Sequence, residues 1–299
     1  MSITPEMVKA LRERTSAGIM ECKRALEKAK GDLDGAAQLL REEGAAKADR
    51  KVGRAAGEGV VAACVAPAGK AGALVELNCE TDFVARTVPF AGLAAGLAEQ
   101  VCAEGVPPDM GAFLDRPALH GAGGQTVGQR VKETIAALGE NIVVRRAERL
   151  AAAGEAGLVT AYIHAGGKIG VLVEMAAGSP AAAAREELAR LARDVAMQVA
   201  AMAPRWVRRG EVPAEALEQE RAVLRAQPDM QGKPPAVQAK IVEGRLGKFY
   251  AEACLLDQPF IKDEERKATV GQQVEAVAKA LGAAVEVRRF CRFKVGEAT

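Results

Sequence analysis

The chain has 299 residues, 49% of them hydrophobic and 27% charged, which is enough for two or three domains with filled cores. Its 41 basic and 39 acidic residues nearly cancel, and this balance argues against a bulk electrostatic affinity for nucleic acid or anionic lipid. Two histidines and three serines leave little material for a Ser-His-Asp triad or a histidine-rich metal site, so we expect no enzyme, no metal and no cofactor.

The hydropathy and cysteine patterns indicate a cytoplasmic protein. No apolar run approaches the roughly 18 residues needed to span a bilayer, so we expect no contact with a membrane. The first residues lack the basic-then-apolar layout of a secretory signal. The six cysteines form no C-x-x-C pair or regular framework, which is typical of reduced thiols in a cytosol.

Residues 1–55 are predicted to form a module of three short helices and a connector. Thr4 caps the first helix and Pro5 takes its first position, where a missing N–H is harmless; Asp32 caps the third helix. Helices this short are marginal alone and must pack as a bundle. The alanine-rich segment 45–54 reads as a helical connector with four solvated basic residues: Lys47, Arg50, Lys51 and Arg54.

After Gly57 the hydrophobic period changes from that of a helix to that of a strand. Runs of apolar residues over 60–64 and 73–77 flank a turn, and this pattern predicts a β-hairpin. Two helices are expected next, over about 88–103 and 127–138, followed by a strand over 142–146. Together these elements predict an α+β unit with an antiparallel sheet.

The whole unit occurs twice. Gly69-Lys70 and Leu74-Val75-Glu76 recur 98 residues later as Gly167-Lys168 and Leu172-Val173-Glu174. Thr126-Val-Gly-Gln129 recurs 143 residues later as Thr269-Val-Gly-Gln272, and the strand ending in Arg145-Arg146 recurs at the same offset. Each Thr-Val-Gly-Gln also reads as a helix capping box. The shared order and offsets nevertheless favour a duplicated α+β core, with 45 more residues in the second copy, the difference between the two offsets.

The additional residues lie among the helices of the second copy. Ser179-Pro180 predicts the start of a helix with one apolar face: Leu188, Leu191, Val195, Val199 and Met202. Two more candidate helices flank a turn at Pro228 to Pro235, and we favour an antiparallel helical hairpin, or coiled coil, that projects from the body. A helix pair packed on the core is the alternative.

Three domains follow from these patterns. We expect an N-terminal three-helix module with its connector over 1–55, a first core subdomain over 56–150 and a second over 151–299, with the hairpin inserted at about 205–253.

Between the first hairpin and its next helix stands Asn78-Cys-Glu-Thr-Asp-Phe-Val-Ala85, which allows two interpretations. In one, Asp82 caps the next turn and Phe83 belongs to the core. In the other, the segment is a tip that presents an aromatic wedge beside a carboxylate. Aromatic side chains that become buried at interfaces dominate binding energies, so the second interpretation predicts a protein-binding site.

The tip motif Thr81-Asp-Phe-Val84 closely resembles that of the bacterial elongation factor Ts family. Further similar segments are Leu11-Arg-Glu-Arg-Thr-Ser-Ala-Gly-Ile-Met20, Gly139-Glu-Asn-Ile142 and Val242-Glu-Gly-Arg245, all in one order from about residue 3 to 297. The resemblance implies a UBA-like N-terminal module, a duplicated α+β core and a helical-hairpin insertion. It also implies a guanine nucleotide exchange factor that binds the GDP form of elongation factor Tu.

By the same resemblance, the tip enters the GTPase, displaces Mg²⁺ and promotes GDP release so that GTP can bind. The residues implied in Mg²⁺ displacement are Thr81, Asp82, Phe83 and Val84. The other residues implied in partner binding are Arg12, Ile19, Met20, Leu138, Gly139 and His164. Many members repeat methionine where this chain has Ile19-Met20, a swap of similar size.

The alternative function is a nucleic-acid-binding accessory factor that uses the basic connector. Seven phenylalanines are scattered without an RNA-binding aromatic signature, so we expect no direct contact with nucleic acid.

Overall fold

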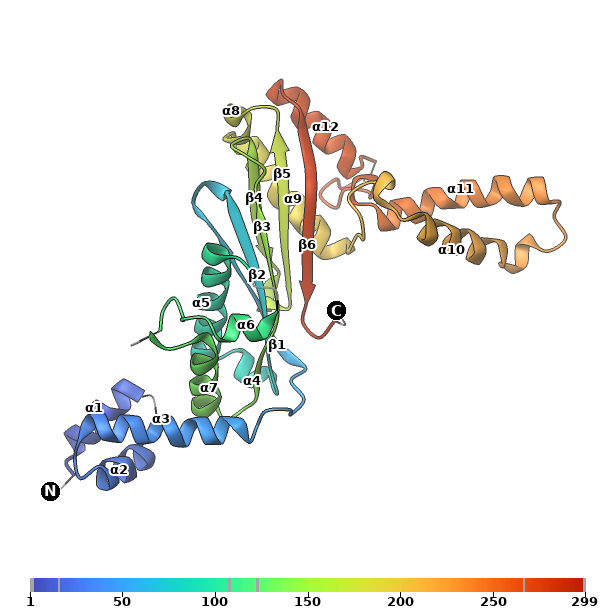
Figure 1. Ribbon diagram of the computed structural model, residues 1–299. Coiled ribbons are helices and arrows are strands. Elements are labelled where there is room, and N and C mark those ends of the chain that lie inside the picture. Colours follow the sequence, from blue (N-terminus) through green and yellow to red (C-terminus); the bar gives the residue numbers. More distant parts are fainter. Residues whose placement is uncertain (1–2, 16, 107–108, 122–123, 266, 298–299) are drawn as a thin grey trace.

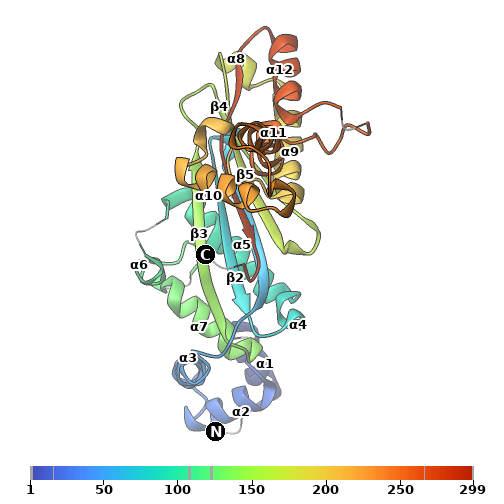
Figure 2. The same cartoon turned by 90° about the vertical axis from the view of Figure 1, so that its right-hand side faces the viewer.

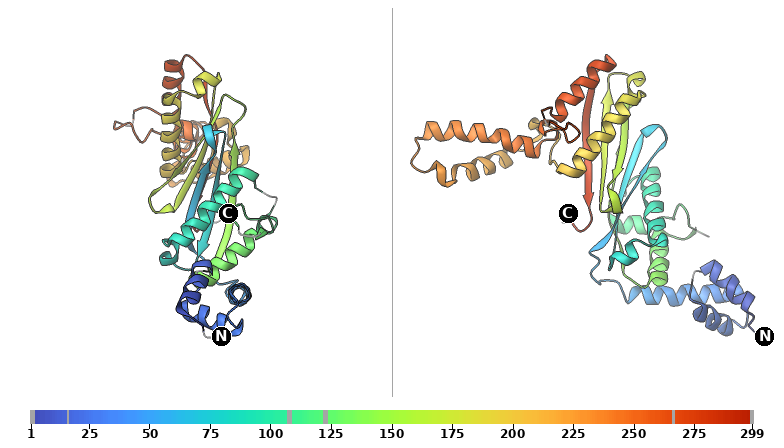
Figure 3. Two further views of the ribbon diagram at one scale, coloured as in Figure 1. Left: turned by 90° about the vertical axis from the view of Figure 1, so that its left-hand side faces the viewer. Right: turned by 180° about the vertical axis from the view of Figure 1, so that it is seen from behind.

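The computed structural model describes residues 3–15, 17–106, 109–121, 124–265 and 267–297, and it shows an elongated α+β molecule (Figure 1). A three-helix module lies at one end and a core of two antiparallel three-stranded sheets lies in the middle. A helical hairpin projects to the other side (Figure 3). The predicted fold class is confirmed. Among the described residues, every helix is too short or too polar to cross a membrane.

The N-terminal module forms because three short amphipathic helices bury one small core. The helices are α1 (Pro5–Thr15), α2 (Ile19–Lys28) and α3 (Leu33–Asp49). The Asp32 side chain accepts hydrogen bonds from the N–H groups of Asp34 and Gly35, so the predicted cap of α3 is confirmed. The buried side chains of the module are Leu11, Cys22, Ala25, Leu26 and Ala36.

The connector is not a separate segment, because α3 continues without a break to Asp49. Three of its basic residues have partners, so the expectation that all four are merely solvated is wrong. Lys47 Nζ lies 2.5 Å from Glu21 Oε1, Lys51 Nζ donates to the Gly139 carbonyl, and Arg54 pairs with Glu80. These partners exist because the helix packs against α2 on one side and against the first core copy on the other.

The first core copy follows the predicted order of a hairpin, helices and a returning strand. Its elements are β1 (Glu58–Val65), β2 (Ala71–Cys79), α4 (Asp82–Ala85), α5 (Val88–Glu104), α6 (Met110–Leu114), α7 (Val127–Leu138) and β3 (Ile142–Ala151). The sheet has the order β1-β2-β3, and α5 and α7 bury one of its faces. The short helices α4 and α6 were not predicted from the sequence.

The second core copy repeats these elements. They are β4 (Gly157–Ile163), β5 (Ile169–Ala177), α8 (Pro180–Ala183), α9 (Glu186–Met202), α12 (Val270–Leu281) and β6 (Val285–Lys294). Both sheets carry a β-bulge at the equivalent point, Glu76/Leu77 and Glu174/Met175, and both predicted capping boxes form. The predicted duplication is confirmed.

The predicted helix after Ser179 differs in detail. Ser179 caps only the single turn α8, and α9 begins separately at Glu186. Four of the five predicted face residues are buried, but Met202 is exposed, because it is the last residue of α9 and the chain leaves the core there.

The two copies pack sheet against sheet. Equivalent side chains meet in a shared apolar layer, formed by Val61, Leu74 and Leu150 from one copy and Val159, Leu172 and Phe293 from the other. A Cβ at Gly72 would lie 2.8 Å from Val159 Cγ1, so glycine is needed for this close approach. Polar contacts are reciprocal too: Lys70 donates to Gly157 O, and Lys168 donates to Gly59 O.

The insertion in the second copy forms a helical hairpin that points away from the core in Figure 1 and is seen end-on in Figure 2. Its helices are α10 (Ala214–Arg225) and α11 (Pro235–Ala253). They bury a small core of their own: Leu224, Met230, Val242 and Leu246. Trp206 and Phe249 are in ring contact at the base, where the hairpin joins the second copy. The predicted domain boundaries stay predictions.

Candidate functional site

The tip between β2 and α5 presents one large apolar side chain to solvent. Thr81 Oγ1 accepts the N–H of Val84 at 3.4 Å and thereby caps the single turn α4. Within this turn, Val84 and Ala85 face the core, whereas Phe83 faces outward with 80% of its surface exposed. The interpretation with Asp82 as the cap and Phe83 in the core is therefore wrong. Phe83 is available as a wedge.

Asp82 lies beside the wedge on the outer side of α4. Its carboxylate is partly exposed and pairs with Arg86 at 2.8 Å, one turn further along. Val88 begins the next helix, α5, and is exposed as well. The tip therefore combines two exposed apolar side chains with a carboxylate, a composition that suits a protein partner with both apolar and polar groups.

A carboxylate from a distant part of the chain holds the tip in place. Glu140 Oε2 accepts the N–H groups of Glu80 at 3.1 Å and Thr81 at 2.9 Å, and Glu140 Oε1 accepts the Thr81 hydroxyl at 2.5 Å. Burial, with a further contribution from the Glu140 charge, raises the pKa of the Cys79 thiol to about 11. Cys79 thus stays a neutral thiol at physiological pH, and its Sγ donates to Thr81 O.

Leu138 and Gly139, which were predicted to contact the partner, lie directly before this carboxylate. Leu138 is half-buried at the end of α7, and Gly139 ends the helix with a φ of +83°. That left-handed conformation favours glycine and turns the chain back towards β3. The structure therefore places these two residues beside the tip, which is more than 50 positions away in the sequence.

Arg12, Ile19 and Met20 form an exposed surface on the N-terminal module. Ile19 is 56% exposed and Met20 64%, at the start of α2. Arg12 lies on α1 and lines a shallow groove between the two helices together with Ile3 and Ile19. Exposed apolar side chains beside a cation make this face a second candidate contact.

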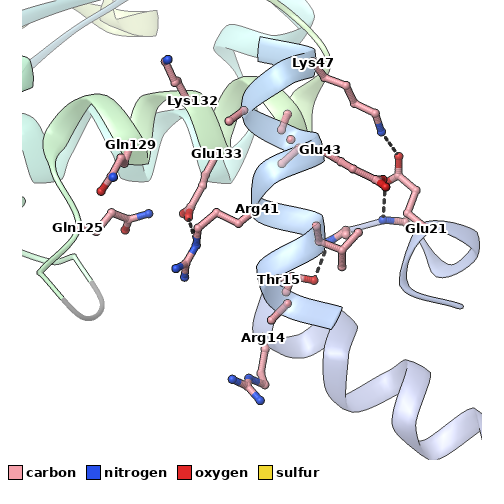
Figure 4. Close-up of a pocket in the computed structure, with 18 residues that line it drawn as sticks. Arg14, Thr15, Glu21, Arg41, Glu43, Lys47, Gln125, Gln129, Lys132 and Glu133 are labelled. Carbon is pink, nitrogen blue, oxygen red and sulfur yellow. Dashed lines mark hydrogen bonds and ion pairs between the residues drawn. The ribbon is translucent and has the colours of Figure 1, made fainter. Parts of the chain in front are cut away.

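Ion pairs link the module to the core and also join two of its own helices. A groove runs between α3 and α7, and Figure 4 shows Arg41 of α3 reaching Glu133 of α7 across it. On the other side of α3, Lys47 reaches Glu21 of α2. Lys132 pairs with Asp49 at 2.8 Å. The contact surface on the N-terminal module is thus linked to the copy of the core that carries the tip.

His164 lies in the hairpin turn of the second copy. Its ring is exposed, and its Nδ1 lies 3.0 Å from the Tyr162 hydroxyl. The turn packs against the start of β1, where Lys168 Nζ lies 2.5 Å from Glu58 Oε2. Because β1 starts beside the end of β2, the turn belongs to the same end of the core as the tip.

The structure thus gathers the predicted residues on three surfaces, the tip with the loop 138–139, the N-terminal module and the turn at His164. Within the described part of the chain, no cluster of histidine, cysteine and acidic residues has the arrangement of a metal site. Sequence reasoning missed Glu140, Val88 and the partners of Lys51 and Arg54. A difference between the two copies could have pointed to Glu140, because the equivalent position in the second copy is Ala283.

Comparisons with known proteins identify the family of the chain. Residues 80–297 match the family model described as elongation factor TS. The elongation factor Ts of Symbiobacterium thermophilum is 44% identical over 99% of this chain and 92% of its own length. The chain belongs to the elongation factor Ts family. Members from Aquifex aeolicus, 43% identical over 99% of both chains, and from Trichlorobacter lovleyi, 41% identical over 99% of this chain and 94% of theirs, are similar to it over nearly the full length as well.

Proposed function

We propose that this translation elongation factor is a guanine nucleotide exchange factor for the GTPase elongation factor Tu, and that it acts in the cytoplasm. The tip enters the GTPase beside its bound Mg²⁺ and GDP, displaces the metal and thereby promotes release of the nucleotide. GTP then binds the emptied site. The activity needs no covalent chemistry, so the protein is not an enzyme in the sense of converting a substrate.

The observation that carries this proposal is the exposure of Phe83 on a firmly held turn. A large apolar side chain in water is unfavourable, and burying it in a partner yields about 1.5–3 kcal/mol. That free energy corresponds to about one to two decades of affinity. Because Thr81 and Glu140 fix the backbone of the tip, little conformational freedom is lost when the partner binds.

Weakening of nucleotide binding follows from linkage. A GTPase holds GDP largely through its phosphate loop and Mg²⁺. If the factor binds the nucleotide-free GTPase more tightly than the GDP form, it must weaken GDP binding by the same factor. One phenylalanine does not supply a large acceleration alone. The surface with Ile19 and Met20 and the turn with His164 supply the remaining contacts.

Replacement of Asp82 and Phe83 together by alanine tests the proposal. We expect release of a fluorescent GDP analogue, followed by stopped flow, to slow by about 10–100-fold, in line with the loss of one buried aromatic contact. The melting temperature should stay unchanged, because both side chains point away from the core.

The matched control is Ala181→Gly, since Ala181 occupies the position of Phe83 in the second copy. We expect release at the unaltered rate with this variant. Undiminished release with the double variant, or a large fall in its melting temperature, would contradict the proposed role of the tip.

A further inference from the structure

The direction in which Phe83 points is set by the main chain before it. Phe83 is too exposed to be held by packing of its own, and α4 is a single helical turn, which is not stable alone. The conformation of Glu80 and Thr81, together with the packing of Val84 and Ala85 on the core, therefore determines where the side chain of Phe83 lies. The N–H groups of Glu80 and Thr81 and the hydroxyl of Thr81 all donate to one carboxylate from another segment, that of Glu140.

The second copy shows what the same backbone does without this carboxylate. There Ala283 takes the place of Glu140 and Gly178 that of Glu80. The N–H of Gly178 donates to the Ala284 carbonyl at 2.8 Å, a main-chain bond that closes the turn. The turn itself therefore needs no glutamate. In the first copy the N–H of Glu80 donates instead to the Glu140 carboxylate, as do the N–H and hydroxyl of Thr81, and such charge-assisted bonds are stronger than neutral ones.

The loop that carries Glu140 is also bound to the segment that follows α3. Asn141 donates from its main-chain N–H to Glu80 Oε1 at 2.7 Å, and its Nδ2 donates to Arg54 O at 2.8 Å. Lys51 donates to the carbonyl of Gly139. The tip, the loop 139–141 and the connector from the N-terminal module thus meet at one point.

From this geometry we infer that Glu140 is a positioning residue for nucleotide exchange, which holds Phe83 at a fixed place relative to the N-terminal docking surface. The inference rests on the proposed function. Glu140 acts through Phe83 and touches neither nucleotide nor metal. Its carboxylate matters because an amide in its place offers only one oxygen to three donors and turns an N–H₂ group towards one of them.

The test is Glu140→Gln, with exchange measured over a range of factor concentrations. We expect the rate of GDP release at saturating factor to fall about tenfold, which corresponds to ~1.4 kcal/mol. The factor concentration at half-maximal release should change far less, since the docking surface with Ile19 and Met20 is untouched. The matched control is Glu275→Gln, an exposed carboxylate on α12, the helix of the second copy that is equivalent to α7, and its rate should equal that of the parent.

The same substitution in a Phe83→Ala background distinguishes a positioning role from a merely structural one. If Glu140 acts through Phe83, Glu140→Gln slows release in the parent and adds nothing once Phe83 is gone, since the two residues form one unit. Equal slowing in both backgrounds overturns the inference. If GDP release with Glu140→Gln proceeds at the parental rate while release with Phe83→Ala alone is slow, the inference is overturned as well. If Phe83→Ala itself releases GDP at the parental rate, the proposed function of the tip fails and the inference fails with it.

Thr81→Val gives a second measurement should Glu140→Gln melt at a much lower temperature. It deletes the hydroxyl that donates to Glu140 and that also caps α4, and it leaves the carboxylate in place. We expect the saturating rate to fall by a few-fold. A parental rate in this variant, with α4 intact by circular dichroism and melting, overturns the inference.

Discussion

In both halves of the core, the middle strand leads into a single turn of helix capped by a hydroxyl, Thr81 in the first copy and Ser179 in the second. The two turns differ in what they present to solvent. The first presents Phe83, whereas the second presents Ala181. At the start of the following helix, exposed Val88 in the first copy corresponds to Glu186 in the second, which pairs with Arg190.

This difference shows how a duplicated scaffold supports two uses. Backbone geometry is shared, down to the bulge in each middle strand, because both copies must form the same sheet and the same inter-copy layer. Side chains that point away from both the sheet and the inter-copy layer are free of that requirement. Among the residues that the structure describes, the apolar tip and its glutamate clamp belong to the first copy and the projecting hairpin belongs to the second.

The largest expected effect concerns an ion pair that occurs at the equivalent place in each copy. Glu76 pairs with Arg146 and Glu174 with Arg289, and each arginine also donates to a main-chain carbonyl of the other copy. We expect Glu76→Ala to lower the free energy of unfolding by about 3–5 kcal/mol, because it leaves a largely buried arginine without its partner. Urea unfolding measures this change.

Glu174→Ala should lower the free energy of unfolding less, which sharpens the comparison. The Arg289 side chain is 54% exposed against 18% for Arg146, so water solvates Arg289 when its partner is removed. Equal losses for the two variants would show that the two pairs are buried to a similar degree in solution.

The next effect concerns the hairpin. The first copy joins α5 to α7 without such an insertion, so we expect the second copy to fold when residues 214–248 are replaced by a short glycine linker. Partner binding should weaken by about tenfold, or 1.4 kcal/mol, while GDP release from the bound complex changes less, because the hairpin lies far from the tip (Figure 1). Gel filtration, circular dichroism and titration with the GTPase measure folding and binding. An unfolded deletion variant would mean that the hairpin belongs to the core.

The smallest effect concerns the two capping boxes, where the copies are alike. Thr126→Ala and Thr269→Ala each remove a hydroxyl that accepts the N–H of a glutamine three residues on. We expect each substitution to lower the free energy of unfolding by about 1 kcal/mol, the usual value of such a cap. Thermal melts of the two variants should be shifted by similar amounts. A shift in only one of them would break the equivalence of the two helices.

Much of this fold was predictable from the sequence because its signals are local. Asp32 and Thr126 cap helices through residues two or three positions away, so their roles can be read directly. The duplication was visible because both copies fulfil the same packing requirements with similar residues at constant offsets. The hairpin was predicted from its apolar spacing, although the sequence left open whether it packs on the core.

Only the tertiary structure decided which side chains meet across long separations. Nothing local distinguishes Lys51 and Arg54 from solvated cations. Yet Lys51 donates to the Gly139 carbonyl, 88 positions away, and Arg54 pairs with Glu80, which follows β2. Phe83 was equally compatible with a core position, and its exposure depends on which face of a single turn the sheet covers. Glu140 became important because the sheet places the end of α7 beside the end of β2. Local sequence determines helix ends and strand periods, whereas contacts between distant segments depend on how the whole core packs.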